Sequence, residues 1–498
     1  MVSPSEADTD SPSTQDKATL RAAKNTVILV ALRLLIPAFS FALVITLSRT
    51  LGAEGLGLYT LAFSYLTLFS SLGPLGLGTV IIRDGAGKPS ELAMMLSNTI
   101  AIGAGASILL TLGMSAIGTV LDYDQATRSA LNLLSLAILP STVLILFDRA
   151  FIALERPLYI AFALMIEHLV KVGGGVVLLI LDFGLESVLI AAILGKSLAC
   201  IASFYYLKRA GVNLHPTIQR KTIKYLSSLV PTFSLITVFA KLYWRIDVVM
   251  LSKLRPIADV GQYGAAYRIF DFGIIFPQSL CLSLYPQIAT AIKEDGKKLS
   301  RLVNVASKYL FAVTLPVAAC ATIVSEGILA LIYGDGFKAA SLTLSILIWT
   351  IIPYSFVRLN AYILISAGFQ KIDLHLNIIM SVINICLNFL LIPLYGHTGA
   401  AVATLISMCI LFLSQSIYLR RHLNDSMGRL NINPIVILGS IIAALFSGLV
   451  EEINLFIVIL STPFLYFMIL FFGGFFSENE LEILHLNSFL KRLRIKRN

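Results

Sequence analysis

The stretch "LSRTLGAEGLGLYTLA" (residues 47–62) reappears without gaps as "LSKLRPIADVGQYGAA" (residues 251–266). Leu, Ser, Gly, Tyr and Ala recur at equivalent positions, and Arg49 is replaced by Lys253. A weaker match at nearly the same offset pairs "LILDFGLESVLIA" (residues 179–191) with "LIPLYGHTGAAVA" (residues 391–403). Together the two matches predict that the chain holds two copies of one structural unit.

The composition indicates that the chain uses lipid as its solvent. Of 498 residues, 57% are hydrophobic and 13% are charged, whereas soluble globular chains carry about 25% charged residues. So little polar surface would not keep a folded chain in solution. The net charge of +10 fits Lys and Arg gathered on one membrane side, so no nucleic-acid partner is expected. The five cysteines have no metal-ligand spacing, and neither a metal nor a cofactor is expected.

Apolar runs of about 20 residues, the length that crosses a bilayer as a helix, recur along the chain. Fourteen candidate spans are predicted, at residues 26–48, 56–81, 92–120, 130–153, 158–181, 186–207, 226–251, 259–285, 303–325, 339–367, 373–394, 399–419, 434–450 and 454–475. With the N-terminus in the cytoplasm, most of the 38 Lys and Arg residues fall in cytoplasmic segments, as the positive-inside rule requires. An even number of spans places the C-terminus there as well.

The expected fold class is an all-α integral membrane protein with about 14 transmembrane helices. Spans 1–6 and 7–12 are expected to form two six-helix lobes related by a parallel pseudo-repeat, because six spans return the chain to the same membrane side. Two C-terminal spans follow. The predicted division is a disordered cytoplasmic tail at 1–25, an N-lobe at 26–207, a cytoplasmic linker at 208–225, a C-lobe at 226–420, spans 13 and 14 at 434–475, and a basic cytoplasmic tail at 477–498 that could form an amphipathic helix.

Charges inside the spans mark the candidate site, because a charge near the bilayer centre costs at least about 2.5–3.5 kcal/mol. Cations there outnumber acids, which predicts a net-positive cavity for an anionic substrate, and the arginine fork suits phosphate. The candidate substrate-binding residues are Arg33, Lys241, Arg245, Arg268 and Arg358. Candidates for charge tuning or ion coupling are Asp247, Asp271, Glu167 and Lys171.

Three of these assignments have structural alternatives. Glu167 and Lys171 are four residues apart on one helix face and could simply form an ion pair. Arg268 and Asp271 are three residues apart and could form a similar pair. Arg33 lies about two turns inside its span and could extend its side chain to the headgroups.

Three segments resemble the Wzx-type polysaccharide transporters of the multidrug/oligosaccharidyl-lipid/polysaccharide exporter superfamily. They are "LSRTLGAEGLGLYTLAFSY", "RIDVVMLSKL…VGQYGAAYRIFD" and "IPLYGHTGAAVATLIS". The resemblance, which extends over nearly the whole chain, implies flipping of undecaprenyl-pyrophosphate-linked oligosaccharide across the bacterial inner membrane by alternating access. It also implies that arginines of the first and eighth spans, here Arg33 and Arg268, meet the pyrophosphate. Membrane lipids, a polysaccharide polymerase and a chain-length regulator would be its partners.

Other functions fit the sequence less well. A peptidoglycan-precursor flippase has the same charge logic, whereas a multidrug extruder would favour acids over cations. A membrane enzyme is expected to carry a large external loop or an acidic catalytic cluster, and neither is present in the sequence. The "GKS" of residues 195–197 resembles the end of a phosphate-binding loop, but Ile190 stands where that motif needs glycine. A role as scaffold in an assembly complex is a further alternative.

Overall fold

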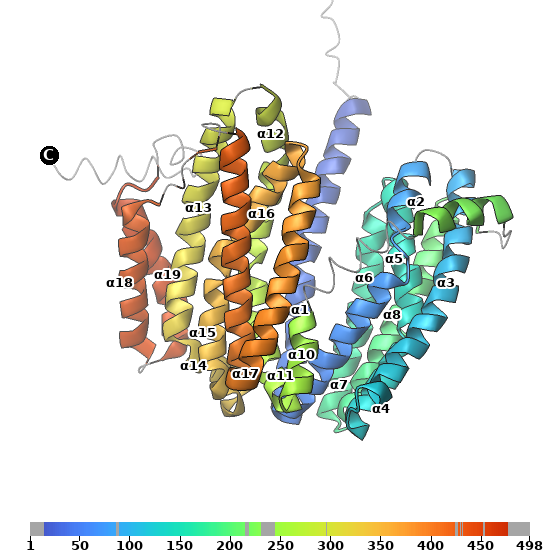
Figure 1. Cartoon of the computed structure of the whole chain (residues 1–498), viewed down its shortest axis with the longest axis horizontal. Helices are drawn as coiled ribbons and strands as arrows, with labels where there is room; N and C mark the ends of the chain where they lie inside the picture. Colours follow the sequence, from blue (N-terminus) through green and yellow to red (C-terminus); the bar gives the residue numbers. More distant parts are fainter. Residues whose placement is uncertain are drawn as a thin grey trace, which may run out of the picture. The chain divides into compact units, whose positions relative to one another are not determined.

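The computed structural model describes residues 14–85, 89–214, 219–230, 245–294, 296–423, 427–428, 430, 432–451 and 454–476, and it describes side chains in these ranges except at 14–38 and 89–90. All regular structure in this part of the chain is helical (Figure 1). A helix satisfies its own backbone hydrogen bonds, which lipid cannot do. The prediction of an all-α membrane protein is therefore confirmed.

The chain divides into two compact units. Unit 1 combines Met1–Thr50 with Tyr65–Val238, and unit 2 combines Leu51–Ser64 with Phe239–Asn498. The segment Leu51–Ser64, which the sequence prediction assigns to the N-lobe, thus belongs to unit 2. The predicted lobe boundaries themselves stay a prediction.

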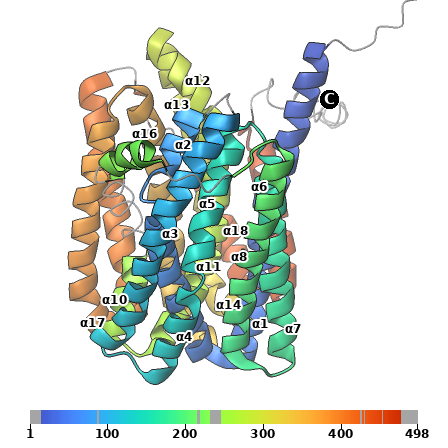
Figure 2. The same ribbon diagram turned by 90° about the vertical axis from the view of Figure 1, so that its right-hand side faces the viewer.

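The helices of the first part of the chain are α1 (Thr14–Leu72), α2 (Gly78–Gly85), α3 (Pro89–Val120), α4 (Gln125–Ser135), α5 (Ile138–Ala153), α6 (Leu158–His168), the π-helix η1 (Leu169–Gly174), α7 (Gly175–Ile180) and α8 (Gly184–Arg209). Those of the second part are α10 (Ile246–Leu254), α11 (Ile257–Gly273), α12 (Ile275–Glu294), α13 (Gly296–Ile323), α14 (Ser325–Tyr333), the 3₁₀ helix η2 (Asp335–Ala340), α15 (Ser341–Trp349), α16 (Ile351–Ser366), α17 (Gln370–Leu423), α18 (Pro434–Glu451) and α19 (Leu455–Phe472). Within unit 1, helices α3, α5, α6 and α8 run side by side (Figure 2).

Among the described residues, ten helices are long and apolar enough to cross a membrane, or up to 11 if the bent pair α4 and α5 is one span. Helix α17 has 54 residues, which is about 80 Å of helix against a hydrocarbon core of about 30 Å. It is broken at Gly396, where φ is 57°. Helix α1 is broken in the same way at Gly52, where φ is 64°. Helix α17 therefore holds the predicted spans 373–394 and 399–419, whereas α1 holds the span 26–48 and the part of the span 56–81 up to Leu72. The total of fourteen stays a prediction.

The two repeated stretches of sequence pack against each other in unit 2. A Cβ atom on Gly57 would lie 2.1 Å from the backbone oxygen of Ile257, at the start of α11. A Cβ atom on Gly264 would lie 2.6 Å from Oγ1 of Thr60. Small residues allow membrane helices to approach this closely, so glycine is required at this crossing.

The second sequence match also has a structural counterpart. Gly184, at the start of α8, and Gly396, at the break in α17, occupy equivalent positions of the matched stretches. Both adopt a left-handed backbone, with φ of 73° and 57°, which glycine reaches at little steric cost. The matched stretches therefore share a sharp turn between two helices.

Unit 1 contains a close helix contact beside its π-helix. Helix α6 continues into η1 and then α7, with a run of glycines at 173–175. A Cβ atom on Gly195 of α8 would lie 2.7 Å from the backbone oxygen of Glu167, at the end of α6. The glycine of the "GKS" stretch thus lets α8 approach α6, and it does not belong to a phosphate-binding loop.

Residues 220–230 are helical and belong to unit 1. Leu226 is fully buried among residues that include Leu77 and Met95. Arg83 donates a hydrogen bond of 2.7 Å to the hydroxyl of Tyr225, which donates one of 3.0 Å to Asp84. The hydrogen bond from Arg83 holds the pKa of the Asp84 carboxyl below its usual value. Part of the predicted linker at 208–225 is therefore a structured segment.

The core of unit 2 is shared by α12, α13, α16, α18 and α19. Helices α18 and α19, which correspond to the predicted spans 13 and 14, pack on each other, and α18 packs on α13 (Figure 1). The predicted amphipathic helix at 477–498 lies outside the described residues.

Candidate functional site

Asp247, in the first turn of α10, is a buried acid in unit 2. Its Oδ2 accepts a hydrogen bond of 2.5 Å from the phenol of Tyr263 on α11, and its Oδ1 accepts one of 2.8 Å from the backbone N–H of Val248. A buried carboxylate without such donors would be costly. Tyr263 therefore fixes this acid at the junction of α10 and α11.

Two arginines lie beside this junction. Arg245 immediately precedes α10, and its guanidinium carbon lies 6.0 Å from the centre of the Tyr267 ring, at the limit of a cation–π contact. Asp271 of α11 interacts electrostatically with both Arg245 and Arg268. Helices α10 and α11 thus bring together four of the predicted residues, Arg245, Asp247, Arg268 and Asp271.

Arg358 lies on α16, with its guanidinium carbon 5.5 Å from the centre of the Tyr362 ring. It interacts electrostatically with Asp373, in the first turn of α17. Tyr354 interacts electrostatically with both Arg358 and Asp271, and its hydroxyl accepts a hydrogen bond of 2.5 Å from Gln278. Electrostatic interactions within unit 2 therefore connect the α10–α11 junction with Arg358 through buried Tyr354, and we call this set of residues the polar path.

The cation excess expected from the sequence is absent from the described charges of this path. Asp271 and Asp247 interact with Arg245, and Asp373 interacts with Arg358. Arginine at membrane depth needs counter-charges, because the hydrocarbon core does not solvate it. The path is thus an alternation of arginine and aspartate with tyrosines between them.

Helix α12 carries a polar face along the same unit. Ser279, Ser283, Gln287 and Thr290 are all exposed, and their spacing of four, four and three residues places them on one side of the helix. Polar side chains within membrane spans normally face a protein interior or a water-filled space, because lipid does not solvate them. We infer that this side of α12 faces such a space.

Unit 1 holds a second charged cluster. Glu167 is buried, and its Oε1 forms an ion pair of 2.9 Å with Nζ of Lys196 on α8. Lys171 interacts electrostatically with the same carboxylate. Asp148 of α5 interacts electrostatically with Glu167 and Lys196. The pair that the four-residue spacing predicts is thus part of a network across three helices.

For two of the predicted binding residues the structure describes no side chain. Arg33 lies on α1, where only the backbone is described, and Lys241 lies outside the described residues. Their roles stay predictions.

Sequence reasoning missed several partners. Tyr263 recurs as Tyr59 in the repeat, and this recurrence was the signal that could have singled it out. Asp373 is the first residue of the predicted span 373–394, so it does not stand out as a charge within a span. Asp148 stands beside Arg149 inside the predicted span 130–153 and is not among the predicted site residues.

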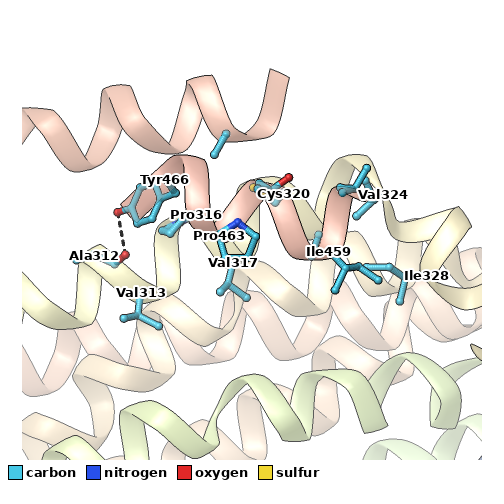
Figure 3. A pocket seen from close by; sticks show the side chains of 14 residues that line it. Ala312, Val313, Pro316, Val317, Cys320, Val324, Ile328, Ile459, Pro463 and Tyr466 are labelled. Atoms are coloured by element: carbon cyan, nitrogen blue, oxygen red, sulfur yellow. Dashed lines mark hydrogen bonds between the residues drawn. The ribbon is translucent and has the colours of Figure 1, made fainter. Parts of the chain in front are cut away.

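An apolar cavity of about 350 Å³ lies elsewhere in unit 2, between α13, α14, α18 and α19 (Figure 3). Its wall includes Val317, Cys320, Ile459 and Pro463. At one end the Tyr466 hydroxyl donates a hydrogen bond of 2.8 Å to the backbone oxygen of Ala312. None of the described residues that line it is charged, so it suits a hydrocarbon chain and not an anion.

Two family models match the chain. The family described as polysaccharide biosynthesis protein matches residues 22–292. The lipid II flippase family matches residues 170–475. Each match extends over more than half of the chain.

Two curated relatives come from Haloferax volcanii. The probable flippase AglR is 30% identical over 176 residues, which is 33% of this chain and 36% of the relative. The probable low-salt glycan biosynthesis flippase Agl15 is 24% identical over 174 residues, 34% of this chain and 36% of the relative. The aligned part thus spans about a third of the length of the curated relatives.

Solved structures share the fold. A lipid II flippase in an inward closed conformation aligns with a TM-score of 0.70 and 16% identity, covering 89% of this chain and 98% of that one. An inward-facing multidrug transporter aligns with a TM-score of 0.64 and 15% identity, covering 80% and 98%. At these identities the likeness concerns the fold alone.

These families are transporters and not enzymes, and their multi-pass helical architecture agrees with the apolar helices described above. The two family matches, the flippase relatives and the shared fold agree with one another. The chain belongs to the polysaccharide biosynthesis protein family, within the superfamily of multidrug, oligosaccharidyl-lipid and polysaccharide exporters.

Proposed function

We propose that the protein flips a polyprenyl-pyrophosphate-linked oligosaccharide, with undecaprenyl as the lipid, across a bacterial inner membrane during surface polysaccharide biosynthesis. Both termini would lie in the cytoplasm, and transport would proceed by alternating access. A polysaccharide polymerase and a chain-length regulator would act beside it. The curated relatives are named as flippases, which supports the lipid-linked class of substrate.

The observation that carries the proposal is that one acid, Asp271, interacts electrostatically with both Arg245 and Arg268. Two arginines close to one carboxylate at membrane depth can turn to the oxygens of a pyrophosphate, since the guanidinium fork binds carboxylate and phosphate with the same geometry. The acid keeps the empty site neutral enough to exist in the membrane. It also competes with bound substrate and so favours release.

The alternative substrate is a peptidoglycan precursor. The lipid II flippase model matches residues 170–475, a range that includes all of α10, α11 and α16. Both substrates carry a pyrophosphate, so Arg245 and Arg268 could bind either one. The two substrates differ in their sugars.

The test is translocation in proteoliposomes that contain the purified full chain. The probe is an undecaprenyl-pyrophosphate-linked N-acetylglucosamine, and the rate is normalised to folded protein. Arg268→Ala should lower the rate roughly ten- to a hundredfold, because a charge-assisted hydrogen bond contributes about 1.5–3 kcal/mol. Arg301→Ala, an exposed arginine at the start of α13, is the matched control.

Unchanged normalised rates in Arg245→Ala and Arg268→Ala would contradict the proposal. Deleting the gene addresses the substrate separately. Loss of a surface polysaccharide with accumulation of its lipid-linked precursor is expected, whereas accumulation of the peptidoglycan precursor would favour the alternative.

A further inference from the structure

We propose that unit 2 contains a separate subsite for the glycan part of the substrate, formed by Tyr285, Arg358, Tyr362, Asp373 and Gln415. The proposal rests on the proposed function and names the part of the substrate that these residues bind. The ligand class is a neutral sugar with several hydroxyl groups.

Two tyrosine rings provide the apolar surface of this subsite. Tyr285 of α12 and Tyr362 of α16 have ring centres 4.8 Å apart, with an angle of 35° between the rings. Both side chains are only partly buried. A sugar ring has an apolar C–H face and a polar edge, and aromatic side chains with a polar tip match that combination.

A fixed carboxylate lies on α17, which packs on α16. Asp373 accepts hydrogen bonds at Oδ1 from Gln415, at 2.8 Å, and from Asn377, at 3.1 Å. Among the described residues, the hydrogen bonds to this carboxylate all reach Oδ1, which leaves Oδ2 to accept from a ligand. Two amides thus hold the carboxylate, and Arg358 of α16 interacts with it electrostatically.

Two buried polar atoms around Asp373 lack hydrogen-bond partners among the described residues. They are the donor Nε of Arg358 and the acceptor Oε1 of Gln415, and the Gln415 side chain is fully buried. A buried polar atom without a partner is costly. An unmet donor on Arg358 and an unmet acceptor on Gln415 suit a ligand that can both accept and donate. A hydroxyl group does both.

The charges select against other ligand classes. A pyrophosphate would meet the carboxylate of Asp373, and a metal or organic cation would meet the guanidinium of Arg358. A neutral polyhydroxylated group is repelled by neither charge, and it can bind the hydrogen-bond donor, the acceptors and the aromatic rings together. The subsite thus differs in composition from the two arginines near Asp271.

Electrostatic interactions connect the subsite with the proposed pyrophosphate site in unit 2. Buried Tyr354 interacts in this way with both Arg358 and Asp271. Arg358 lies two turns before the end of α16 at Ser366, and Asp373 lies in the first turn of α17. A substrate whose pyrophosphate binds Arg245 and Arg268 would therefore extend its sugars toward this end of the bundle.

The test compares two probes that differ only in the sugar. The full chain in nanodiscs is titrated with undecaprenyl pyrophosphate and with undecaprenyl-pyrophosphate-linked N-acetylglucosamine. We expect the wild-type protein to bind the sugar-bearing probe about tenfold more tightly, which corresponds to about 1.4 kcal/mol. Asp373→Asn and Tyr362→Leu should remove this preference and leave the affinity for the bare probe unchanged. Tyr362→Phe, which keeps the ring, should retain most of it.

Tyr395→Leu, an exposed tyrosine on α17, is the matched control and should leave the preference intact. Equal wild-type affinities for the two probes would overturn the subsite, as would Asp373→Asn and Tyr362→Leu variants that weaken both probes equally. Arg268→Ala separates this outcome from the proposed function. It should weaken both probes to the same extent, and an unchanged affinity there would contradict the pyrophosphate site and not the subsite.

Discussion

Gly57 and Gly261, equivalent residues of the sequence repeat, each press against the backbone of the other's segment. A Cβ atom on Gly57 would lie 2.1 Å from the oxygen of Ile257, and one on Gly261 would lie 1.9 Å from the oxygen of Ala53. Ala53 and Ile257 are themselves equivalent in the repeat. The contact is therefore self-complementary, as in an isologous dimer interface, although both segments belong to one chain.

Gly261→Ala is expected to destabilise unit 2. The added methyl group meets a backbone oxygen, which cannot rotate away, and overpacking of this kind costs about 1–3 kcal/mol. Thermal denaturation of the detergent-solubilised protein should show the lower Tm. Gly105→Ala on α3, where a Cβ atom meets nothing within 4 Å, is the control. Equal Tm values for the two variants would disprove the tight crossing.

Tyr263→Phe should destabilise the protein more than the same change at Tyr333. Tyr263 donates to the buried carboxylate of Asp247, and a hydrogen bond to a charged group contributes about 1.5–3 kcal/mol. Tyr333 donates at 3.2 Å to the neutral backbone oxygen of Ala265, where about 0.5–1.5 kcal/mol is expected. Denaturation midpoints of the two variants give the comparison. A larger loss at Tyr333 would argue against a charged Asp247.

Asp271→Asn should raise substrate affinity and lower turnover. The substitution removes the acid that competes with pyrophosphate for Arg245 and Arg268, so binding should tighten about tenfold, or ~1.4 kcal/mol. Release should slow in proportion. Titration of the nanodisc-embedded protein and flipping rates in proteoliposomes measure the two effects. Weaker binding would mean that Asp271 orders the arginines and does not compete for them. Asp335→Asn, which changes an acid of a surface ion pair, is the control.

Lys196→Met should destabilise unit 1 by leaving Glu167 without its closest partner. Breaking a buried ion pair costs about 3–5 kcal/mol, and the remaining interaction with Lys171 favours the lower end. The double variant Glu167→Gln with Lys196→Met removes both charges and should recover much of the loss. A double-mutant cycle of unfolding free energies measures the coupling. Additive losses would show that the two residues act independently.

The all-helical fold and the rough placement of the spans follow from the sequence, because an apolar segment of bilayer length satisfies its backbone hydrogen bonds in lipid as an α-helix. The structure shows that the second sequence match includes two glycines with positive φ, Gly184 and Gly396. The structure adds that Leu51–Ser64 packs in unit 2. That grouping depends on the glycine crossing, which no local pattern contains.

The candidate site was predictable as a set of residues but not as a set of pairs. Arg245, Asp247, Arg268 and Asp271 stand out in sequence because charges are rare in apolar runs. Their partners come from other helices, as with Tyr263 for Asp247 and Lys196 for Glu167. Helical spacing identifies neighbours within one helix only, so it found Lys171 and missed Lys196.

The π-helix at Leu169–Gly174 lets unit 1 absorb a change of chain length. A Cβ atom on Gly173 would meet nothing within 4 Å, so substitution there is sterically open. Deletion of Gly173 would remove the extra residue of the π-turn and leave an ordinary α-helical turn. Buried Leu179 and exposed Val177 would then keep their present faces. The same deletion inside α7 would rotate every later residue of that helix by about 100°, so the π-turn is the place in this helix where a one-residue gap is best tolerated.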